Sequence, residues 1–117
     1  MAYVWAHRGA SAYAPENTLE AFRLAAELHA DGIELDVHLS KDGEVVVAHD
    51  ETVKRTTCGV TDKRLVDMTV EEMQKIDVWN GKEGYHGAHI PTLRQVLEFL
   101  KTNNLFLNIE LKTTDIF

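Results

Sequence analysis

Alternating apolar and polar positions predict where the strands and helices of this chain lie. Short apolar runs rich in β-branched or aromatic residues are typical of strands, and apolar residues three or four positions apart are typical of helices. The strands predicted in this way cover residues 3–6, 33–39, 44–48 and 105–111, with helices between them. Strands that alternate with helices favour an α/β fold with a largely parallel sheet.

Each predicted helix begins at a residue whose side chain can cap its first turn. A Thr or Asn followed three residues later by Glu or Gln satisfies backbone donors that lack a partner inside the helix. This spacing begins at Asn17, with Thr18 as the alternative cap, at Thr69 for a short helix over residues 70–76, and at Thr92. The last helix is expected to bury four apolar residues, which are Leu93, Val96, Leu97 and Leu100.

A turn between two of the predicted strands sets the position of a histidine. The segment Lys41–Gly43 combines a charged residue, an aspartate and a glycine, which is a strong turn signal. If the chain folds back there, His49 falls beside Leu35 and Asp36 on the neighbouring strand. Residues 51–91, which follow, show no long hydrophobic period.

Composition and charge limit the partners of the chain. Its 117 residues allow one domain, and 12 Lys and Arg against 19 Asp and Glu give a formal net charge of -7. Such an acidic surface repels phosphate backbones, so nucleic acids and anionic membranes are unfavourable partners. The lone cysteine, Cys58, cannot form an internal disulfide, and neither a membrane span nor a signal peptide is recognisable, so we expect a cytoplasmic protein.

Three acidic residues lie on two predicted strands. Glu34 and Asp36 are two positions apart and therefore project from one face of their strand. By itself, this pair is better explained as the polar face of a half-exposed strand. Glu110 changes that interpretation, because a carboxylate in an otherwise apolar, buried strand is costly unless it is paired or functional. Three carboxylates on two strands predict a site for Mg²⁺ or Ca²⁺, which prefer oxygen ligands.

Two histidines directly follow predicted strands. His7 and Arg8 end the first strand, and His49 ends the third. Either histidine alone is better explained as a hydrogen-bonded core residue, but a pair at strand ends could divide general acid and general base work. The planar guanidinium of Arg8 suits a phosphoryl group, and Lys112 offers a point charge.

A series of short motifs, in order along nearly the whole chain, resembles those of the glycerophosphodiester phosphodiesterase family. No single motif is decisive, but the ordered set is highly specific. The motifs are His7-Arg8-Gly9, Pro15-Glu16-Asn17-Thr18, Gly32-Ile33-Glu34-Leu35-Asp36-Val37, Lys41-Asp42-Gly43, His49-Asp50, Arg55-Thr56-Thr57, Ile90-Pro91-Thr92-Leu93 and Ile109-Glu110-Leu111-Lys112.

The resemblance implies a partial (β/α) TIM barrel, about the first half, as a single incomplete domain over residues 1–117. Residues 51–91 correspond to the family's small insertion after the third strand. A complete barrel of this type needs eight strands and about 250 residues, whereas the chain supplies strands for about four. The strands that would close the barrel and shape the alcohol pocket are therefore expected from elsewhere.

The resemblance also implies a reaction and the residues that perform it. The family splits a glycerophosphodiester into glycerol 3-phosphate and an alcohol, as a metal-dependent phosphoric diester hydrolase. The residues carried over are Glu34, Asp36 and Glu110 as ligands of Mg²⁺ or Ca²⁺, His7 and His49 as the acid–base pair, and Arg8 and Lys112 as phosphate contacts.

Three other interpretations stay open at this point. A related lipid phosphodiesterase, such as a phospholipase-D-type sphingomyelinase, would share the architecture, but the motifs at residues 55–57 and 90–93 favour the first family. A non-catalytic half-barrel that binds a cation, or that closes one barrel by forming a homodimer, would need no turnover. The third interpretation is that the chain is a truncation product or a gene-model fragment.

Overall fold

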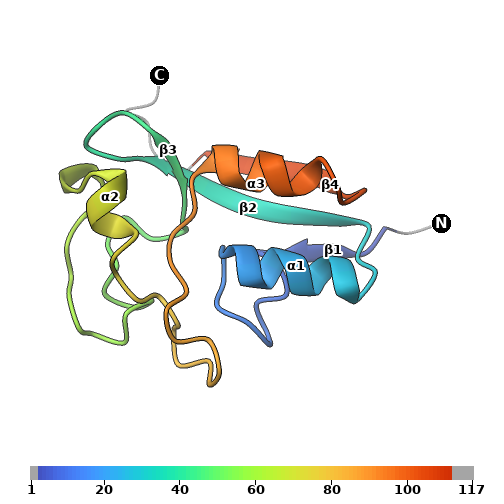
Figure 1. The fold of residues 1–117 in the computed structure, drawn as a ribbon, viewed down its shortest axis with the longest axis horizontal. Helices are drawn as coiled ribbons and strands as arrows, with labels where there is room; N and C mark the ends of the chain where they lie inside the picture. Colours follow the sequence, from blue (N-terminus) through green and yellow to red (C-terminus); the bar gives the residue numbers. More distant parts are fainter. Residues whose placement is uncertain (1–2, 112–117) are drawn as a thin grey trace.

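The computed structural model describes residues 3–111 of the chain. Two helices pack along a small sheet, and a loop-rich segment extends from one end of it (Figure 1). The elements in chain order are β1 (Trp5–His7), α1 (Leu19–Glu27), β2 (Gly32–Leu39), β3 (Val45–Val47), a 3-10 helix (Leu65–Asp67), α2 (Val70–Met73), α3 (Leu93–Leu100) and β4 (Phe106–Leu111). Each predicted strand is found within two residues of its expected bounds.

β2 is the central strand of the sheet. Residues 32–34 pair in parallel with both β1 and β4, whereas Val37 pairs with β4 and, in the antiparallel sense, with β3. β1 and β3 therefore share one edge of β2, and β4 occupies the other. The largely parallel sheet is confirmed, with β3 as its exception. The expected number of about four strands is confirmed for residues 3–111, and β3 runs back along β2 as the predicted hairpin.

Side-chain caps begin the helices where the spacing predicts them. Thr69 and Thr92 each form a complete capping box. α1 is capped by Thr18, whose Oγ1 accepts a hydrogen bond from the backbone N–H of Ala21 at 3.2 Å. Asn17, the other predicted cap, instead has a φ of 55° and a buried side chain, so it is available to the site described below.

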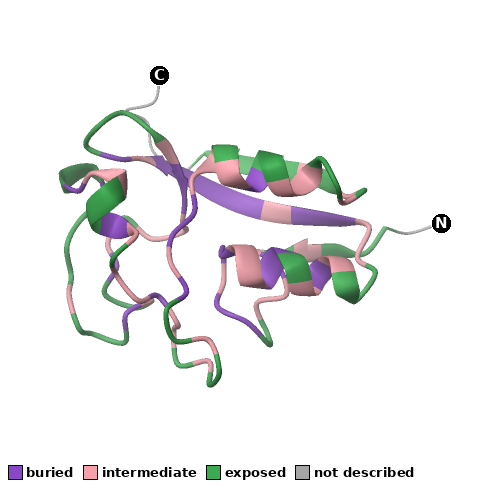
Figure 2. Ribbon diagram, in the orientation of Figure 1, coloured by how far each residue is buried: buried purple, intermediate pink, exposed green. Residues whose placement is uncertain are grey.

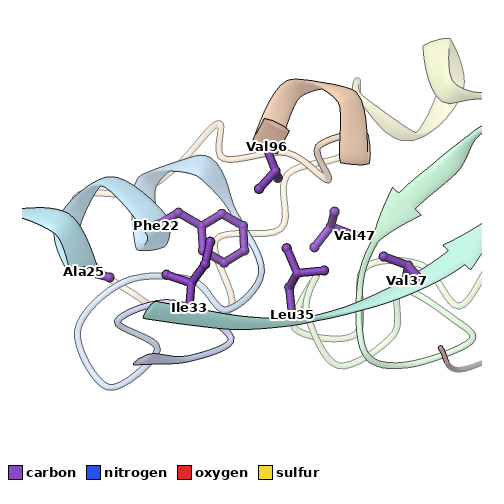
Figure 3. Close-up of a cluster of buried hydrophobic side chains, with 7 residues drawn as sticks. All are labelled: Phe22, Ala25, Ile33, Leu35, Val37, Val47 and Val96. Atoms are coloured by element: carbon purple, nitrogen blue, oxygen red, sulfur yellow. The ribbon is translucent and has the colours of Figure 1, made fainter. Parts of the chain in front are cut away.

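The main core lies between β2 and the helices α1 and α3 (Figure 3). Phe22 and Val96 point from the helices toward Ile33 and Leu35 of β2, and all four are fully buried. Burial of side chains of this size contributes about 1.5–3 kcal/mol each. Leu97 was expected in this core but is 46% exposed. The packed face of α3 is centred on Val96, so the next position, about 100° further around the helix, turns toward solvent.

Residues 51–91 build a second, smaller core. α2 covers only Val70–Met73 and is shorter than predicted. The buried apolar residues of this cluster are Val46, Val53, Leu65, Met68, Met73, Val78 and Ile90. Because Val46 belongs to β3, the cluster anchors the loop-rich segment to the end of the sheet. Its status as a separate insertion stays a prediction.

β4 is more exposed than the sequence suggests. Phe106, Ile109 and Leu111 are 57%, 39% and 48% exposed, and β4 contrasts in Figure 2 with the mostly buried β2. The expectation of a buried strand around Glu110 is therefore wrong for residues 3–111, because β4 pairs there with β2 on one edge only. Near the start of the sheet, Tyr3 packs edge-to-face on Phe106 with ring centroids 5.4 Å apart.

Within the described part of the chain, none of the helices has the length and apolar character needed to cross a membrane. The cytoplasmic location stays a prediction.

Candidate metal and phosphate site

Three carboxylates from β2 and β4 meet on one face of the sheet. Ile33 and Leu35 face the helices, so the alternation of side chains along β2 places Glu34 and Asp36 on the opposite face. Asp36 is in register with Glu110 of β4. Each of the three acids offers one oxygen, and these oxygens lie within 4.8 Å of one another. The structure therefore brings together the three residues predicted as metal ligands.

The electrostatics of this cluster fit a divalent cation. Asp36 is fully buried, and Oε1 of Glu34 is buried without a hydrogen bond to the described residues. Burial raises the pKa of the Glu34 carboxyl, and the nearby negative charge of Asp36 raises it further. A positive ion between the carboxylates would remove that repulsion. Because the donors are all oxygen, they suit Mg²⁺ or Ca²⁺ better than Zn²⁺.

Arg8 approaches the carboxylates from the end of β1. Its backbone N–H donates to the carbonyl of Glu34 at 2.7 Å, and its φ is 58°, a left-handed conformation that residues other than glycine adopt at a cost. The Nε atom lies 3.6 Å from Oδ2 of Asp36. That Nε is buried and has no hydrogen-bond partner among residues 3–111, so it can donate to an anion bound at the site.

His7 lies beside the carboxylates on the same face of the sheet. It is in register with Glu34, and its Nε2 is 3.6 Å from Oε1 of that residue. The loop after His7 needs a glycine at position 9. Gly9 has a φ of +79°, and a Cβ there would lie 2.8 Å from Cβ of Ala21. The close approach of this loop to α1 fixes the positions of His7 and Arg8 at the end of β1.

His49 lies where the predicted hairpin puts it along the chain. The backbone N–H of Ala48 donates to the carbonyl of Asp36 at 2.9 Å, so the end of β3 runs beside the carboxylates. Nδ1 of His49 is 2.8 Å from Oδ1 of Asp50. An ionised carboxylate only accepts, so Nδ1 carries the hydrogen. The backbone carbonyl of His49 accepts a hydrogen bond from Nε2 of the buried His38 at 2.9 Å.

Four further polar residues, to which the sequence assigned no role in the site, connect the site residues. Asn17 donates through Nδ2 to Oδ2 of Asp36 at 3.0 Å. Arg55 donates to the carboxylates of both Glu16 and Asp50. All four belong to the ordered motifs noted above, which was the available signal. A motif does not show which side chains pair across 39 positions of sequence, as Glu16 and Arg55 do.

Arg55 controls the charge of both its partners. Its hydrogen bonds and charge, with the hydrogen bond from His49, lower the pKa of Asp50 to about 2 despite partial burial. Burial raises the pKa of the Glu16 carboxyl, but hydrogen bonds from Arg55 and the charges of Arg55 and Arg8 outweigh that effect, so the net shift is downward. Both carboxylates are therefore ionised at neutral pH.

Lys112, the second expected phosphate contact, lies outside the described residues. The other predicted site residues, His7, Arg8, Glu34, Asp36, His49 and Glu110, all lie along the strand ends and the sheet face opposite the helices.

Comparisons with known proteins place the chain in a family. A sequence model described as the glycerophosphoryl diester phosphodiesterase family matches residues 7–116. A glycerophosphodiester phosphodiesterase of Caldanaerobacter subterraneus subsp. tengcongensis is 50% identical over 111 residues, which cover 94% of this chain and 45% of that protein.

Solved structures resemble the fold as well. A glycerophosphodiester phosphodiesterase from Agrobacterium tumefaciens matches with a TM-score of 0.89 and 40% identity, over 98% of this chain and 49% of that one. A phosphodiesterase from Oleispira antarctica, solved in complex with the product sn-glycerol-3-phosphate, matches with a TM-score of 0.88 and 38% identity, over 98% and 46%. The chain thus spans about half the length of the relatives it matches, which is consistent with a partial TIM barrel.

Proposed function

This chain belongs to the glycerophosphoryl diester phosphodiesterase family, and we propose that it carries the metal and phosphate site for hydrolysis of glycerophosphodiesters to glycerol 3-phosphate and an alcohol. The observation that carries the proposal is the convergence of Glu34, Asp36 and Glu110, with oxygens within 4.8 Å of one another, beside Arg8 and His7. This grouping combines what a phosphodiester hydrolase needs, namely ligands for a cation, a guanidinium for phosphate and groups that transfer protons.

We assign the three carboxylates as ligands of Mg²⁺ or Ca²⁺. When bound, such a cation polarises a phosphoryl oxygen and orients the substrate. Arg8 contributes a planar set of donors for the phosphoryl oxygens, and Asn17 holds Asp36 in place through its 3.0 Å hydrogen bond. Lys112 is proposed as a second phosphate contact.

The two histidines are proposed as the acid and the base. The base removes the proton from the attacking oxygen, which comes from water or from the neighbouring glycerol hydroxyl, as that oxygen bonds to phosphorus. The acid gives a proton to the oxygen of the departing alcohol as its bond to phosphorus breaks. His49 is suited to proton transfer at Nε2, since Nδ1 already donates to Asp50. His7 is largely exposed and accessible to a substrate bound at the carboxylates.

The open edges of the sheet support a proposal about what completes the site. Apolar surface is exposed by Trp5 of β1, by Val4 just before it, and by Phe106 and Ile109 of β4. Further barrel strands would cover this surface. We propose that a C-terminal half of the barrel packs there. The same exposed surface favours a second candidate, a non-catalytic half-barrel that binds a cation or pairs with a second copy of itself.

Release of glycerol 3-phosphate tests the proposal. We would assay glycerophosphodiesters with Mg²⁺, with Ca²⁺ and with EDTA, using the chain alone and the chain extended by the C-terminal half of a relative. We expect cation-dependent release that falls about 100-fold or more in Asp36→Asn, since one lost charge-stabilising group commonly costs ~10²–10³ in rate. Asp62→Asn, at an exposed position, serves as the matched control and should keep full activity.

The same assay separates the two candidates. No release by any well-folded form would contradict the hydrolase proposal. Release by the extended chain only would support the proposal that a C-terminal half completes the pocket. A folded dimer of this chain that binds the cation but releases nothing would favour the non-catalytic half-barrel.

A further inference from the structure

Arg55 binds two carboxylates at once, and these come from different parts of the chain. Its Nη1 and Nη2 donate to Oε1 and Oε2 of Glu16 at 2.5 and 2.9 Å. Its Nε and Nη2 donate to Oδ2 and Oδ1 of Asp50 at 2.9 and 3.1 Å. Glu16 belongs to the loop between β1 and α1, and Asp50 follows β3. One guanidinium therefore joins two loops by two bidentate contacts.

Each carboxylate bound by Arg55 also contacts a residue of the proposed site. Glu16 accepts a hydrogen bond from Nη1 of Arg8 at 3.3 Å. Oδ1 of Asp50 accepts the Nδ1 hydrogen of His49 at 2.8 Å. The Glu16 side chain is only 9% exposed, so its orientation is fixed by the surrounding chain rather than by solvent. Displacement of Arg55 would free both carboxylates and, through them, the phosphate-binding guanidinium and the imidazole.

We propose that Arg55 is a positioning residue, which holds Arg8 and His49 toward the same substrate without touching it; this inference rests on the proposed function. Through Asp50 it keeps the hydrogen of His49 on Nδ1 and leaves Nε2 for proton transfer. Through Glu16 it restrains the side chain of Arg8 beside Asp36. The two loops follow strands on one edge of β2 that do not pair with one another, and Arg55 forms hydrogen bonds with a residue of each loop.

The shape of the guanidinium, and not only its charge, is what the proposal requires. A lysine would place one ammonium between the carboxylates and could not make two parallel contacts to each. We therefore expect Arg55→Lys to behave nearly as Arg55→Ala does. The exposed Arg94 of α3 provides a matched control, Arg94→Lys, for the loss of an arginine elsewhere.

The first test is the tautomer of His49, which does not depend on activity. Side-chain ¹⁵N NMR of the protein should show the hydrogen of His49 on Nδ1 in the wild type and in Arg94→Lys. In Arg55→Ala and Arg55→Lys we expect a mixture of the Nδ1–H and Nε2–H forms. An unchanged His49 tautomer in folded Arg55→Ala would overturn the inference, as would complete restoration of the wild-type signal by Arg55→Lys.

The second test is kinetic, in the form of the protein that releases glycerol 3-phosphate. We expect kcat to fall about 10–100-fold in both Arg55 variants, because small misplacements of reacting groups cost up to ~10²-fold, together with a smaller rise in KM because Arg8 loses its restraint through Glu16. A rise in KM alone, with kcat unchanged, would contradict a positioning role for His49. If the wild type has no turnover, the proposed function fails, and the NMR experiment still decides the role of Arg55.

Discussion

Replacing Glu34 by glutamine should stabilise the cation-free protein and remove its response to divalent cations. Glu34 and Asp36 offer oxygens within 4.8 Å of each other, and two unit charges at that separation repel by about 3.5 kcal/mol at an effective dielectric constant of ~20. Partial exposure of Glu34 and salt screen this repulsion, so we expect a gain of about 1 kcal/mol in the cation-free variant.

Saturation with a cation should stabilise the wild type much more than it stabilises Glu34→Gln. A ligand at 100 times its Kd stabilises the state that binds it by about 2.7 kcal/mol. Each kcal/mol shifts the Tm of a domain of about 100 residues by roughly 4–8 °C, so the wild type should gain about 10–20 °C with saturating Mg²⁺ or Ca²⁺. Glu34→Gln, which lacks one anionic ligand, should gain little.

Thermal unfolding followed by circular dichroism, in EDTA and with each cation, measures both effects. Glu44→Gln removes an exposed carboxylate from the turn region and should behave as the wild type does. A lower Tm of Glu34→Gln than of wild type in EDTA would refute the argument from repulsion. If the cation raised the Tm of Glu34→Gln as much as that of the wild type, the assignment of Glu34 as a ligand would be refuted.

Three further predictions follow from particular contacts. The pKa of Asp50 is lowered from 3.8 to about 2, so ionised Asp50 stabilises the fold above pH 3.8, and this stabilisation is lost as the pH falls toward 2. The free energy of unfolding, measured with urea, should fall by about 1–2 kcal/mol over that range. Asp50→Asn should not show this fall. Gly9→Ala should destabilise the protein by about 2–4 kcal/mol, as measured by urea unfolding. Gly43 also has a positive φ, but nothing lies within 4 Å of a Cβ there, so Gly43→Ala should cost only about 1 kcal/mol. Thr92→Ala should cost about 1 kcal/mol because its side chain caps α3, while exposed Thr102→Ala should stay within about 0.5 kcal/mol; equal effects of the two threonines would contradict the capping argument.

Local patterns in the sequence predict the local structure well. The caps at Thr69 and Thr92 were recognisable because a capping box needs only residues three positions apart. The Lys41–Gly43 turn likewise indicates the hairpin, which places His49 beside Asp36. Alternation along β2 was enough to place Glu34 on the same face as Asp36, since that face follows from the period of a strand.

Contacts between distant parts of the chain were not predictable in this way. The exposure of β4 depends on which strand, if any, pairs with its free edge. The apolar pattern of β4 itself does not predict that partner. Arg55 and Glu16 are 39 positions apart, and nothing in either segment specifies the other as a partner. Leu97 was misplaced because the orientation of α3 is set by its packing on β2, and a pattern of four leucines and valines tolerates a small rotation.

The central claim is that Glu34, Asp36 and Glu110 together hold a divalent cation. Anomalous diffraction from crystals of the protein saturated with Mn²⁺ or Ca²⁺ tests it most directly. We predict a peak about 2.0–2.6 Å from one oxygen of each of the three carboxylates, the range that such cations adopt with oxygen ligands. A saturated crystal with no peak among these carboxylates, or with its peak elsewhere on the protein, would contradict the claim.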